Sequence, residues 1–304
     1  MAPTRTEAVH KDAGGIDAQA PESILGLLAS AQVEAAGAVH AAIPAIAAAA
    51  ARIADRLASG GRLVYAAAGS SGLMALADAL ELPGTFGIPR DRVVVLLAGG
   101  TDSLVNLTGA PEDDADQAIS ELAAAGLDAG DCLIAVSASG STPFAVGALK
   151  EAKRRGAATI AIANNAGAPM FDLAEIAILL ATPPEVVAGS TRMGAGTSQK
   201  IALNMMSTLA AVHLGHVHDG YMVNLVADNL KLHERAARIV SAISGCDTAT
   251  AKALLERSGG SVKVAILLAS GASSLEAANQ LLDGADQKLR SALSKLEGSR
   301  GSHQ

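Results

Sequence analysis

The chain has 304 residues, enough for one large α/β domain or two smaller units at about 150 residues per domain. Its 23 basic and 30 acidic residues give a formal net charge of -7 and a sequence pI of about 5.5. This balance disfavours nucleic acid or an anionic membrane as a partner. Hydrophobic residues make up 50% and charged residues 17%, so the chain is globular and not disordered.

Aromatic and metal-binding residues exclude further classes of function. The chain has two Tyr, three Phe and no Trp, which argues against the stacking surfaces of single-strand nucleic-acid modules and of aromatic sugar-binding clefts. Cys132 and Cys246 stand far apart without zinc-ligand spacing. His213, His216 and His218 lie close in sequence. On one helix, residues three apart share a face, but a third ligand with useful spacing for that face is missing. We therefore expect no metal and no disulfide.

The amino-terminal part of the chain predicts helices. Apolar residues recur at spacings of three and four between residues 21 and 57, and Pro44 is expected to divide this stretch into two helices. The longest apolar run, residues 41–51, is shorter than the ~20 residues of a bilayer span. The first residues lack the apolar segment of a secretory signal. A cytoplasmic location is the expectation.

Five apolar runs alternate with helical segments in the middle of the chain. Continuous apolar strands alternating with helices are typical of a parallel sheet that is covered on both faces. Ligands of such sheets bind beyond the carboxyl ends of the strands. The predicted strands are residues 62–66, 92–97, 132–136, 158–163 and 176–180.

The rest of the chain is predicted to be helical. A long helix is expected over residues 196–214, and short helices interrupted by Ser-Gly pairs indicate a small bundle over residues 243–296. We expect an α/β fold with a three-layer domain, amino-terminal helices and a small carboxyl-terminal helical unit. The predicted division is a helical segment at 1–54, the sheet domain at 55–218 and the helical region at 219–304.

A hydroxyl-rich segment follows the third predicted strand. Ser137, Ser139, Ser141 and Thr142 precede Pro143, which is well suited to the first turn of a helix. One hydroxyl would be enough for an ordinary helix cap. Four hydroxyls beside a helix amino terminus, where backbone N–H groups and the helix dipole favour an anion, favour a phosphate site instead.

A second such segment follows the first strand. Ser70, Ser71 and Gly72 form a small-residue loop before a helix predicted over residues 73–80, and both loops should open at the same edge of the sheet. Neither is a Walker A motif or a dinucleotide-binding GxGxxG motif, so ATP and NAD are not expected and no cofactor is implied. A phosphorylated small molecule is the predicted ligand.

These motifs carry a resemblance to known families. Residues 137–165, SASGSTPFAVGALKEAKRRGAATIAIANN, resemble the sugar isomerase (SIS) phosphosugar-binding domain. Further motifs are similar to those of the N-acetylmuramic acid 6-phosphate etherase family over almost the whole chain. They are Thr6-Glu7, DALELP at residues 78–83, Glu112-Asp113, EVVAGSTRM at residues 185–193, Gln199-Lys200 and NLKL at residues 229–232 with Arg235.

The etherase resemblance implies an activity and its residues. The family cleaves the lactyl ether of N-acetylmuramic acid 6-phosphate by elimination and hydration, giving N-acetylglucosamine 6-phosphate and D-lactate. This carbon–oxygen lyase activity belongs to amino sugar catabolism and peptidoglycan recycling. The family's acid and base fall on Glu81, as proton donor to lactate, and Glu112, as base for the C2 proton. Without the resemblance, each would be interpreted as a surface carboxylate.

The resemblance also implies further ligand contacts and an assembly. Ser190, Thr191 and Arg192 are candidate substrate-binding residues. The Arg192 guanidinium could bind the phosphate or the lactyl carboxylate, or could equally form a structural salt bridge. A homodimer with its active site near the subunit boundary is implied. The sequence departs from the family at three positions that usually carry a cation, which are Leu73, Ser141 and Gly194 here.

Two other functions compete with the etherase activity. A non-catalytic sugar-phosphate sensor on the same fold, like the related glucokinase regulatory protein, is favoured by the three missing cations. Retention of both Glu81 and Glu112 favours the enzyme. A phosphosugar isomerase would also form an enolate, but the etherase-like motifs after Glu185 disfavour it.

Overall fold

The structure, a computed structural model, describes residues 5–106 and 108–301. Its residues group into two compact units. Unit 1 comprises Met1–Ala79 and Asp91–Leu209, and unit 2 comprises Leu80–Arg90 and Ala210–Gln304. The three-part division expected from the sequence stays a prediction.

Unit 1 contains a parallel sheet of five strands in the order β2-β1-β3-β4-β5. All five predicted strands are confirmed, each within one residue at either end. The connection after β1 leads to β2 on one side of β1, and the connection after β2 leads to β3 on the other side. The topological switch point therefore lies between β1 and β3. The strands are β1 (Leu63–Ala67), β2 (Val93–Leu97), β3 (Cys132–Ser137), β4 (Ala158–Ala163) and β5 (Ile176–Leu179).

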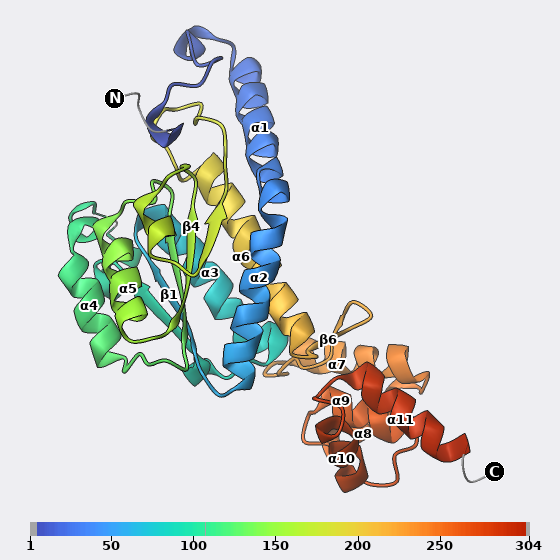
Figure 1. Ribbon diagram of the computed structural model, residues 1–304. Helices are drawn as coiled ribbons and strands as arrows, with labels where there is room; N and C mark the ends of the chain where they lie inside the picture. The colour runs from blue at the N-terminus through green and yellow to red at the C-terminus, as the bar shows by residue number, and fades with distance from the viewer. Residues whose placement is uncertain (1–4, 107, 302–304) are drawn as a thin grey trace. The chain divides into compact units, whose positions relative to one another are not determined.

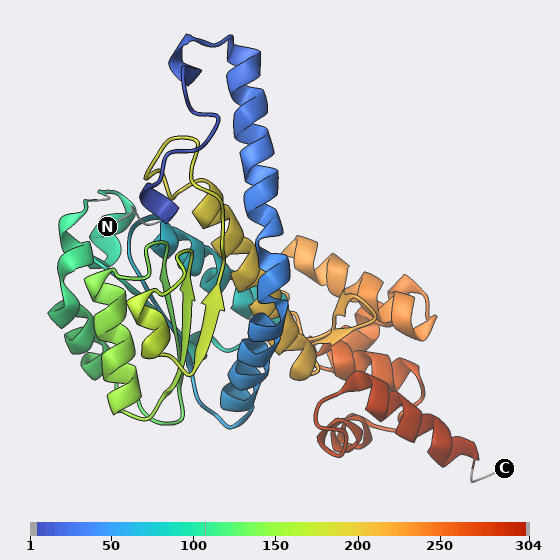
Figure 2. The ribbon, with the colours of Figure 1, turned by 45° about the horizontal axis from the view of Figure 1, so that its top comes forward.

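Helices cover both faces of this sheet, as predicted (Figures 1 and 2). Helices α4 (Ala115–Ala124) and α5 (Pro143–Arg154) pack on one face, and α2 (Val39–Ala58) contacts β1, β3 and β5 on the other. The strands are apolar except for Ser137 at the end of β3 and Thr159 in β4, and β1, β3 and β4 are buried at every position. Since both faces exclude water, small and branched residues replace the polar alternation of a one-sided sheet.

Two more helices begin in unit 1. Helix α3 (Gly69–Phe86) follows β1, and α6 (Gly194–His213) is the predicted long helix, with its start two residues earlier than expected. Short 3-10 turns also occur between residues 5 and 172. They are Arg5–Glu7, Ile16–Ala18, Arg90–Arg92, Gly100–Leu104, Ala110–Asp113 and Pro169–Asp172.

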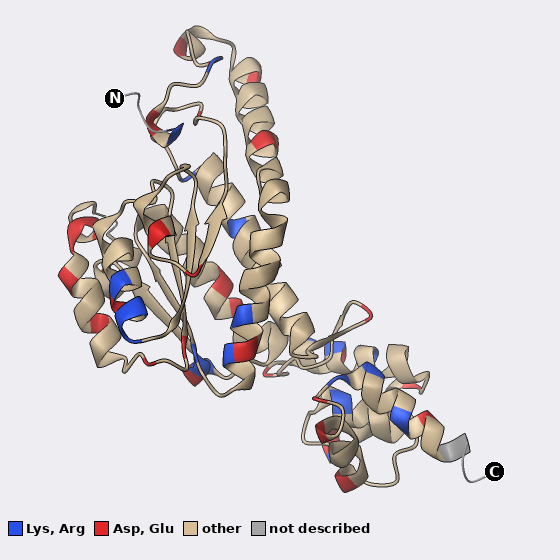
Figure 3. Cartoon of the chain, in the orientation of Figure 1, with Lys and Arg blue, Asp and Glu red and all other residues tan. Residues whose placement is uncertain are grey.

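The amino-terminal helices divide at a different residue from the one expected. Helix α1 (Pro21–Gly37) and α2 are joined at Ala38, whereas Pro44 lies inside α2. Pro44 is the sixth residue of α2, and its missing N–H removes one backbone hydrogen bond, to the carbonyl of His40, without ending the helix. The prediction that Pro44 separates two helices was therefore wrong, and the 40° bend lies at Ala38. Figure 3 shows how few charges α1 carries, Glu22 and Glu34 alone.

Tyr65 anchors a buried polar cluster between the sheet and two helices of unit 1. Its hydroxyl donates to Asp78 Oδ2 at 2.8 Å, and Asp78 Oδ1 accepts from Asn204 Nδ2 at 2.7 Å and from Ser207 Oγ at 2.9 Å. Asp78 is 3% exposed, so three donors replace its lost water contacts. Burial raises the pKa of the Tyr65 phenol well above its ordinary value.

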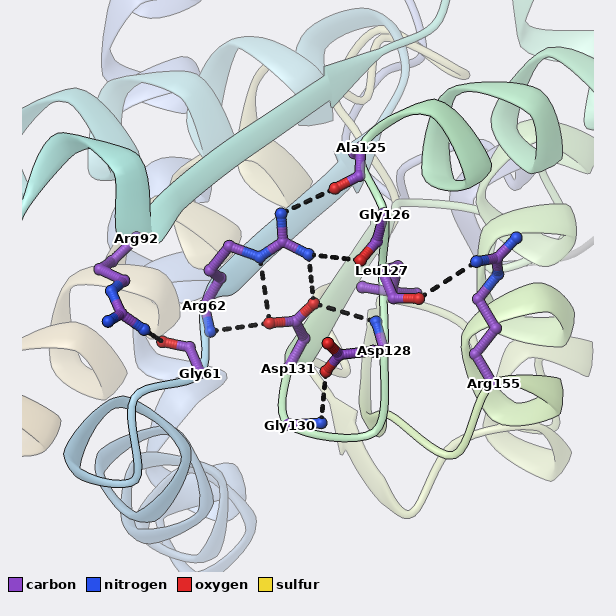
Figure 4. Close-up of polar contacts among 10 residues, drawn as sticks. All are labelled: Gly61, Arg62, Arg92, Ala125, Gly126, Leu127, Asp128, Gly130, Asp131 and Arg155. Carbon is purple, nitrogen blue, oxygen red and sulfur yellow. Dashed lines mark hydrogen bonds and ion pairs between the residues drawn. The ribbon is translucent and has the colours of Figure 1, made fainter.

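Charged residues join the loops at the amino ends of the strands (Figure 4). Arg62, just before β1, reaches Asp131, just before β3, through Nε at 3.2 Å and Nη2 at 2.6 Å. The same guanidinium donates to the carbonyl oxygens of Ala125 and Gly126, and the backbone N–H groups of Arg62 and Asp128 donate to the Asp131 carboxylate. The Asp131 side chain is 3% exposed, and its hydrogen bonds to Arg62 and to backbone N–H groups lower its pKa although burial opposes them.

Unit 2 is the expected small helical unit, and it also contains a short antiparallel hairpin of β6 (Val217–His218) and β7 (Tyr221–Met222) before its helical bundle. Its helices share one apolar core. Lys263 is buried in this unit and donates to the carbonyl oxygen of Gln287 at 3.0 Å. The helices are α7 (Leu230–Ser244), α8 (Thr248–Arg257), α9 (Val262–Ala269), α10 (Leu275–Asp283) and α11 (Leu289–Gly301).

Within the part of the chain that the structure describes, no single helix combines the length and apolar composition of a membrane span. Helices α1 and α2 reach that length and composition only together, as a bent pair.

Candidate functional site

A cavity of about 200 Å³ lies at the carboxyl ends of β1 and β3, next to the switch point of the sheet. Most candidate hydroxyl residues line it together with Glu112, so residues far apart in the sequence meet in one place. The lining residues are Thr6, Glu7, Ala68, Ser70, Ser71, Glu112, Ser137, Ala138, Ser139, Thr142, Gly189 and Thr191.

The first hydroxyl segment is the opening turn of α3 and not a free loop. Helix α3 begins at Gly69, four residues before the predicted start, and Gly72 N–H donates to the Ala68 carbonyl at 2.9 Å. In an α-helix the N–H groups of the first turn have no intrahelical acceptor. Ser70 and Ser71 therefore bring both hydroxyls and helix-terminal N–H groups to the cavity, which suits an anion.

The second segment, between β3 and α5, is organised by Ser137. Its Oγ lies 2.7 Å from Thr142 Oγ1 and 3.2 Å from Ser139 Oγ, and it accepts the N–H of Gly140 at 3.0 Å. Thr142 precedes α5 but makes no side-chain cap bond to it. The hydroxyls are thus bonded to one another and not spent on an ordinary helix cap.

Gly140 lets this loop lie against its neighbours. Its φ is +72°, in the left-handed region, and a Cβ atom there would lie 2.8 Å from the Cβ of Ala163 and closer still to that of Ala168. A side chain at this position would displace the loop and its three hydroxyls.

Glu112 reaches the cavity from the 3-10 turn Ala110–Asp113. It rests on the first turn of α3, because a Cβ atom at Gly69 would lie 2.5 Å from Glu112 Oε1. Burial raises the pKa of Glu112, and the neighbouring Asp113 carboxylate raises it further. A half-buried carboxyl with a raised pKa is suited to accept a proton from carbon near neutral pH.

The sequence interpretation missed the contribution of the amino-terminal segment. Thr6 is 5% exposed, and its N–H donates to Asn165 Oδ1 at 3.2 Å while Asn165 Nδ2 donates to Thr6 Oγ1 at 3.0 Å. These bonds bring Glu7 to the rim of the cavity. Thr6-Glu7 was noticed only as part of the family resemblance, and Asn165 only as the end of a strand.

Four candidate binding residues do not line this cavity. Gly72 lies one residue further into α3, and Ser141 is exposed and donates to Ser139 Oγ at 3.2 Å. Ser190 is half-buried and Arg192 is exposed, although both flank Thr191, which does line it.

Glu81 lies on the part of α3 that belongs to unit 2, whereas Glu112 belongs to unit 1. Glu81 is exposed on α3, eleven residues after Ser70, which corresponds to an axial distance of about 16 Å. Two groups that serve adjacent atoms of one sugar must each lie within about 3 Å of their target. The pairing of Glu81 with Glu112 therefore stays a prediction.

The charge of the cavity agrees with the sequence, which lacks the family's cation at Leu73, Ser141 and Gly194. Among the described residues that line it, two are glutamates and none is lysine or arginine. Leu73 is 38% exposed, and Gly194 is buried at the start of α6, where its N–H donates to Glu185 Oε2 at 2.9 Å. Among these described residues, the hydrogen-bond donors are hydroxyls and backbone N–H groups.

A larger cavity of about 820 Å³ lies in unit 2, between the 223–227 segment and helices α7 to α9. Its lining is mainly apolar and lacks a cluster of hydroxyls beside strand ends, so we assign the site to the smaller cavity in unit 1. In the described ranges, 5–106 and 108–301, no group of three or more His, Cys, Asp and Glu side chains is placed to hold a metal ion.

The fold agrees with proteins of known structure. The family model of the SIS domain matches residues 29–164. A phosphoheptose isomerase from Francisella tularensis superimposes with a TM-score of 0.51 at 19% sequence identity, over 64% of this chain and 100% of that one. At this identity the likeness concerns the fold, which is that of SIS domains.

Sequence relatives are much closer. An N-acetylmuramic acid 6-phosphate etherase from Deinococcus radiodurans is 41% identical over 97% of both chains. One from Erwinia tasmaniensis is 43% identical over 85% of this chain and 84% of its own. With this identity along almost its full length, the chain belongs to the N-acetylmuramic acid 6-phosphate etherase family.

Proposed function

We propose that this chain is an N-acetylmuramic acid 6-phosphate etherase, a lyase that releases D-lactate and N-acetylglucosamine 6-phosphate. The observation that carries the proposal is the position of Glu112, whose half-buried carboxyl shares one cavity with the hydroxyls of Ser70, Ser71, Ser137, Ser139 and Thr142. A phosphate held by these donors would place the sugar beside a carboxyl whose pKa is raised. The family membership supplies the substrate.

The chemistry follows from the acidity of a carbon next to an aldehyde. Opening of the sugar ring exposes the C1 aldehyde, and Glu112 removes the proton from C2. The electron pair then forms the C2–C3 double bond, the C3–O bond breaks, and a general acid protonates the departing lactate oxygen. Water then adds its hydroxyl to C3 and gives its proton to the general acid, while Glu112 returns a proton to C2, which completes a net hydrolysis.

We propose that Glu81 of a second copy of the chain supplies the acid. Glu81 is exposed on α3, eleven residues after Ser70, and so is accessible to a second copy of the chain. A homodimer with its active sites near the subunit boundary would bring an exposed Glu81 to the partner's cavity. A C2 dimer forms two identical sites in this way.

Arg192 is proposed to meet the lactyl carboxylate at the rim of the cavity. It is exposed and follows Thr191, which lines the cavity, while the lining itself provides no cation. A guanidinium can bind a carboxylate through two parallel hydrogen bonds. Ser190 and Ser141 would remain outside the first contacts of the ligand. A cytoplasmic location stays a prediction.

The activity is tested by incubating the chain with N-acetylmuramic acid 6-phosphate and measuring D-lactate. We expect release by the wild type and loss of release in Glu112→Gln. Binding of the sugar phosphate without release by the wild type would contradict the etherase activity and favour the sugar-phosphate sensor.

The shared site is tested by mixing two inactive variants. Glu81→Gln and Glu112→Gln should each be inactive alone, but a dimer with one copy of each contains one intact site. After statistical subunit exchange we expect about a quarter of the wild-type rate. Mixtures that stay inactive, although mass spectrometry shows mixed dimers, would contradict the second-copy origin of Glu81.

A further inference from the structure

Glu7 is a second carboxylate at the cavity, and the reaction described above does not use it. Its Oε2 would lie 3.3 Å from a Cβ atom at Gly189, a glycine with φ of +75° that also lines the cavity. Glu7 thus lies on a glycine at one rim, as Glu112 lies on Gly69 at another. Both contacts depend on the absence of a side chain at these glycines.

The backbone around Glu7 is fixed by its neighbour Thr6. Thr6 exchanges two hydrogen bonds with Asn165, and its carbonyl oxygen accepts the N–H of Gly189 at 3.2 Å. Asn165 Nδ2 also donates to the carbonyl oxygen of Ser139 at 3.2 Å. The segment that carries Glu7 is therefore tied directly to the hydroxyl loop after β3.

The charge of Glu7 limits which part of a ligand it can meet. A carboxylate repels a phosphate, whereas the hydroxyls and N–H groups of the two helix starts attract it. An ionised carboxylate accepts hydrogen bonds and donates none. Its partners on a sugar phosphate are hence the hydroxyl and amide N–H groups of the sugar.

We propose that Glu7 contacts the sugar of the bound ligand and selects a sugar phosphate over phosphate alone, with Thr6 and Asn165 as its positioning residues. The inference rests on the proposed function for the sugar-phosphate site, but not on lactate release. Glu7 sets specificity, and Glu112 transfers the proton.

The test compares two ligands by calorimetry, N-acetylglucosamine 6-phosphate and inorganic phosphate. Hydrogen bonds to a charged group are strong enough that Glu7→Gln should weaken the sugar phosphate by about 10- to 100-fold. The affinity for inorganic phosphate should stay the same or rise, because a negative charge is removed. Glu22→Gln is the matched control. It changes an exposed glutamate on α1, away from the cavity lining, and should alter neither affinity.

Thr6→Val tests the positioning role without removing the carboxylate. It should weaken the sugar phosphate and leave inorganic phosphate unchanged, and its effect should be less than additive with that of Glu7→Gln, because both act on one contact. Parallel losses for both ligands in Glu7→Gln would show a structural role and overturn the proposal.

The outcomes separate this inference from the proposed function. If the wild type binds N-acetylglucosamine 6-phosphate and Glu7→Gln binds it equally well, only the inference on Glu7 fails. If the wild type binds the sugar phosphate through Glu7 but releases no lactate, the etherase proposal fails and the role of Glu7 stands. If the folded wild type binds no sugar phosphate, both fail.

Discussion

The two ends of the sheet in unit 1 are built from different chemistry. At the amino ends of β1 and β3, Arg62 and Asp131 form a charged pair whose remaining donors and acceptors are satisfied by backbone groups. At the carboxyl ends, hydroxyls bond to one another, and two glutamates line a cavity without a lysine or arginine among its described lining residues. One end joins the loops, and the other leaves polar groups available to a ligand.

This difference shows how a parallel sheet separates stability from function. A buried charge must be paired, and once paired it has little left to offer a ligand. Weak hydroxyl contacts are exchanged easily for contacts with a bound phosphate. The amino end therefore fixes the register of β1 and β3, and the carboxyl end uses that rigidity to hold its loops.

The largest effect is expected from Glu112 at the carboxyl end. Glu112→Gln should lower lactate release by about 10²- to 10⁴-fold, the usual contribution of general acid–base catalysis. Solvent deuterium exchange at C2 should fall with it. Glu81→Gln is the matched variant and should lose release but retain some exchange, since proton removal precedes departure of lactate. Nearly wild-type release from both folded variants would contradict the assignment.

A somewhat smaller effect is expected from the hydroxyl loop. Removing Ser137 and Ser139 hydroxyls together should weaken hexosamine 6-phosphate binding by roughly 10²-fold or more, because each hydrogen bond to a charged group contributes ~1.5–3 kcal/mol. Calorimetry on folded Ser137→Ala/Ser139→Ala checks this, with inorganic phosphate as a second ligand that should weaken in parallel. An unchanged affinity would exclude the loop as the phosphate site.

At the amino end we expect a change in stability and none in chemistry. Arg62→Met leaves the buried Asp131 carboxylate without its cation and should lower the free energy of unfolding by about 3 kcal/mol. Arg92→Met is the matched control, because Arg92 makes only a 3.4 Å bond to the Gly61 carbonyl at this end, and it should cost less than about 0.5 kcal/mol. Urea unfolding measures both, and a loss of kcat in folded Arg62→Met would break the separation of the two ends.

The smallest effect is a pH dependence of opposite sign at the two ends. The lowered pKa of Asp131 adds stability that is present above its unfolded pKa of about 3.8 and is lost as the pH falls below it. The raised pKa of Glu112 does the reverse, because the folded state holds its proton longer, so stability falls as the pH rises above about 4.5 through the raised value. Carboxyl carbon NMR titrations should place the two midpoints on opposite sides of the ordinary range.

The fold was predictable because its pattern is local. Five apolar runs bounded by small-residue loops define the strands, and the alternation with helices defines a parallel sheet. Pro44 misled the interpretation because α2 continues through it at the loss of one backbone hydrogen bond, while the bend occurs at Ala38, directly after Gly37. Gly69 likewise looks like a loop residue but opens α3.

The site was predictable only in part, for a physical reason. Ser137, Ser139 and Thr142 lie within six residues, so a local sequence pattern reveals them. Glu112 was found through the resemblance. Glu7 enters the cavity through hydrogen bonds between residues 6 and 165, a pairing that no local pattern encodes. The sequence interpretation ended this helix at about residue 80, whereas the structure extends α3 to Phe86 and so places Glu81 within it.

The scarcity of aromatic residues has a spectroscopic consequence. The chain contains no Trp and only two Tyr, and these fall in different units. Tyr65 is buried in unit 1 and bonded to Asp78, whereas Tyr221 is 40% exposed in unit 2. In Tyr221→Phe, ultraviolet fluorescence excited through tyrosine would follow unit 1 alone, and in Tyr65→Phe it would follow unit 2 alone. The native chain thus carries one optical reporter for each unit without any added label.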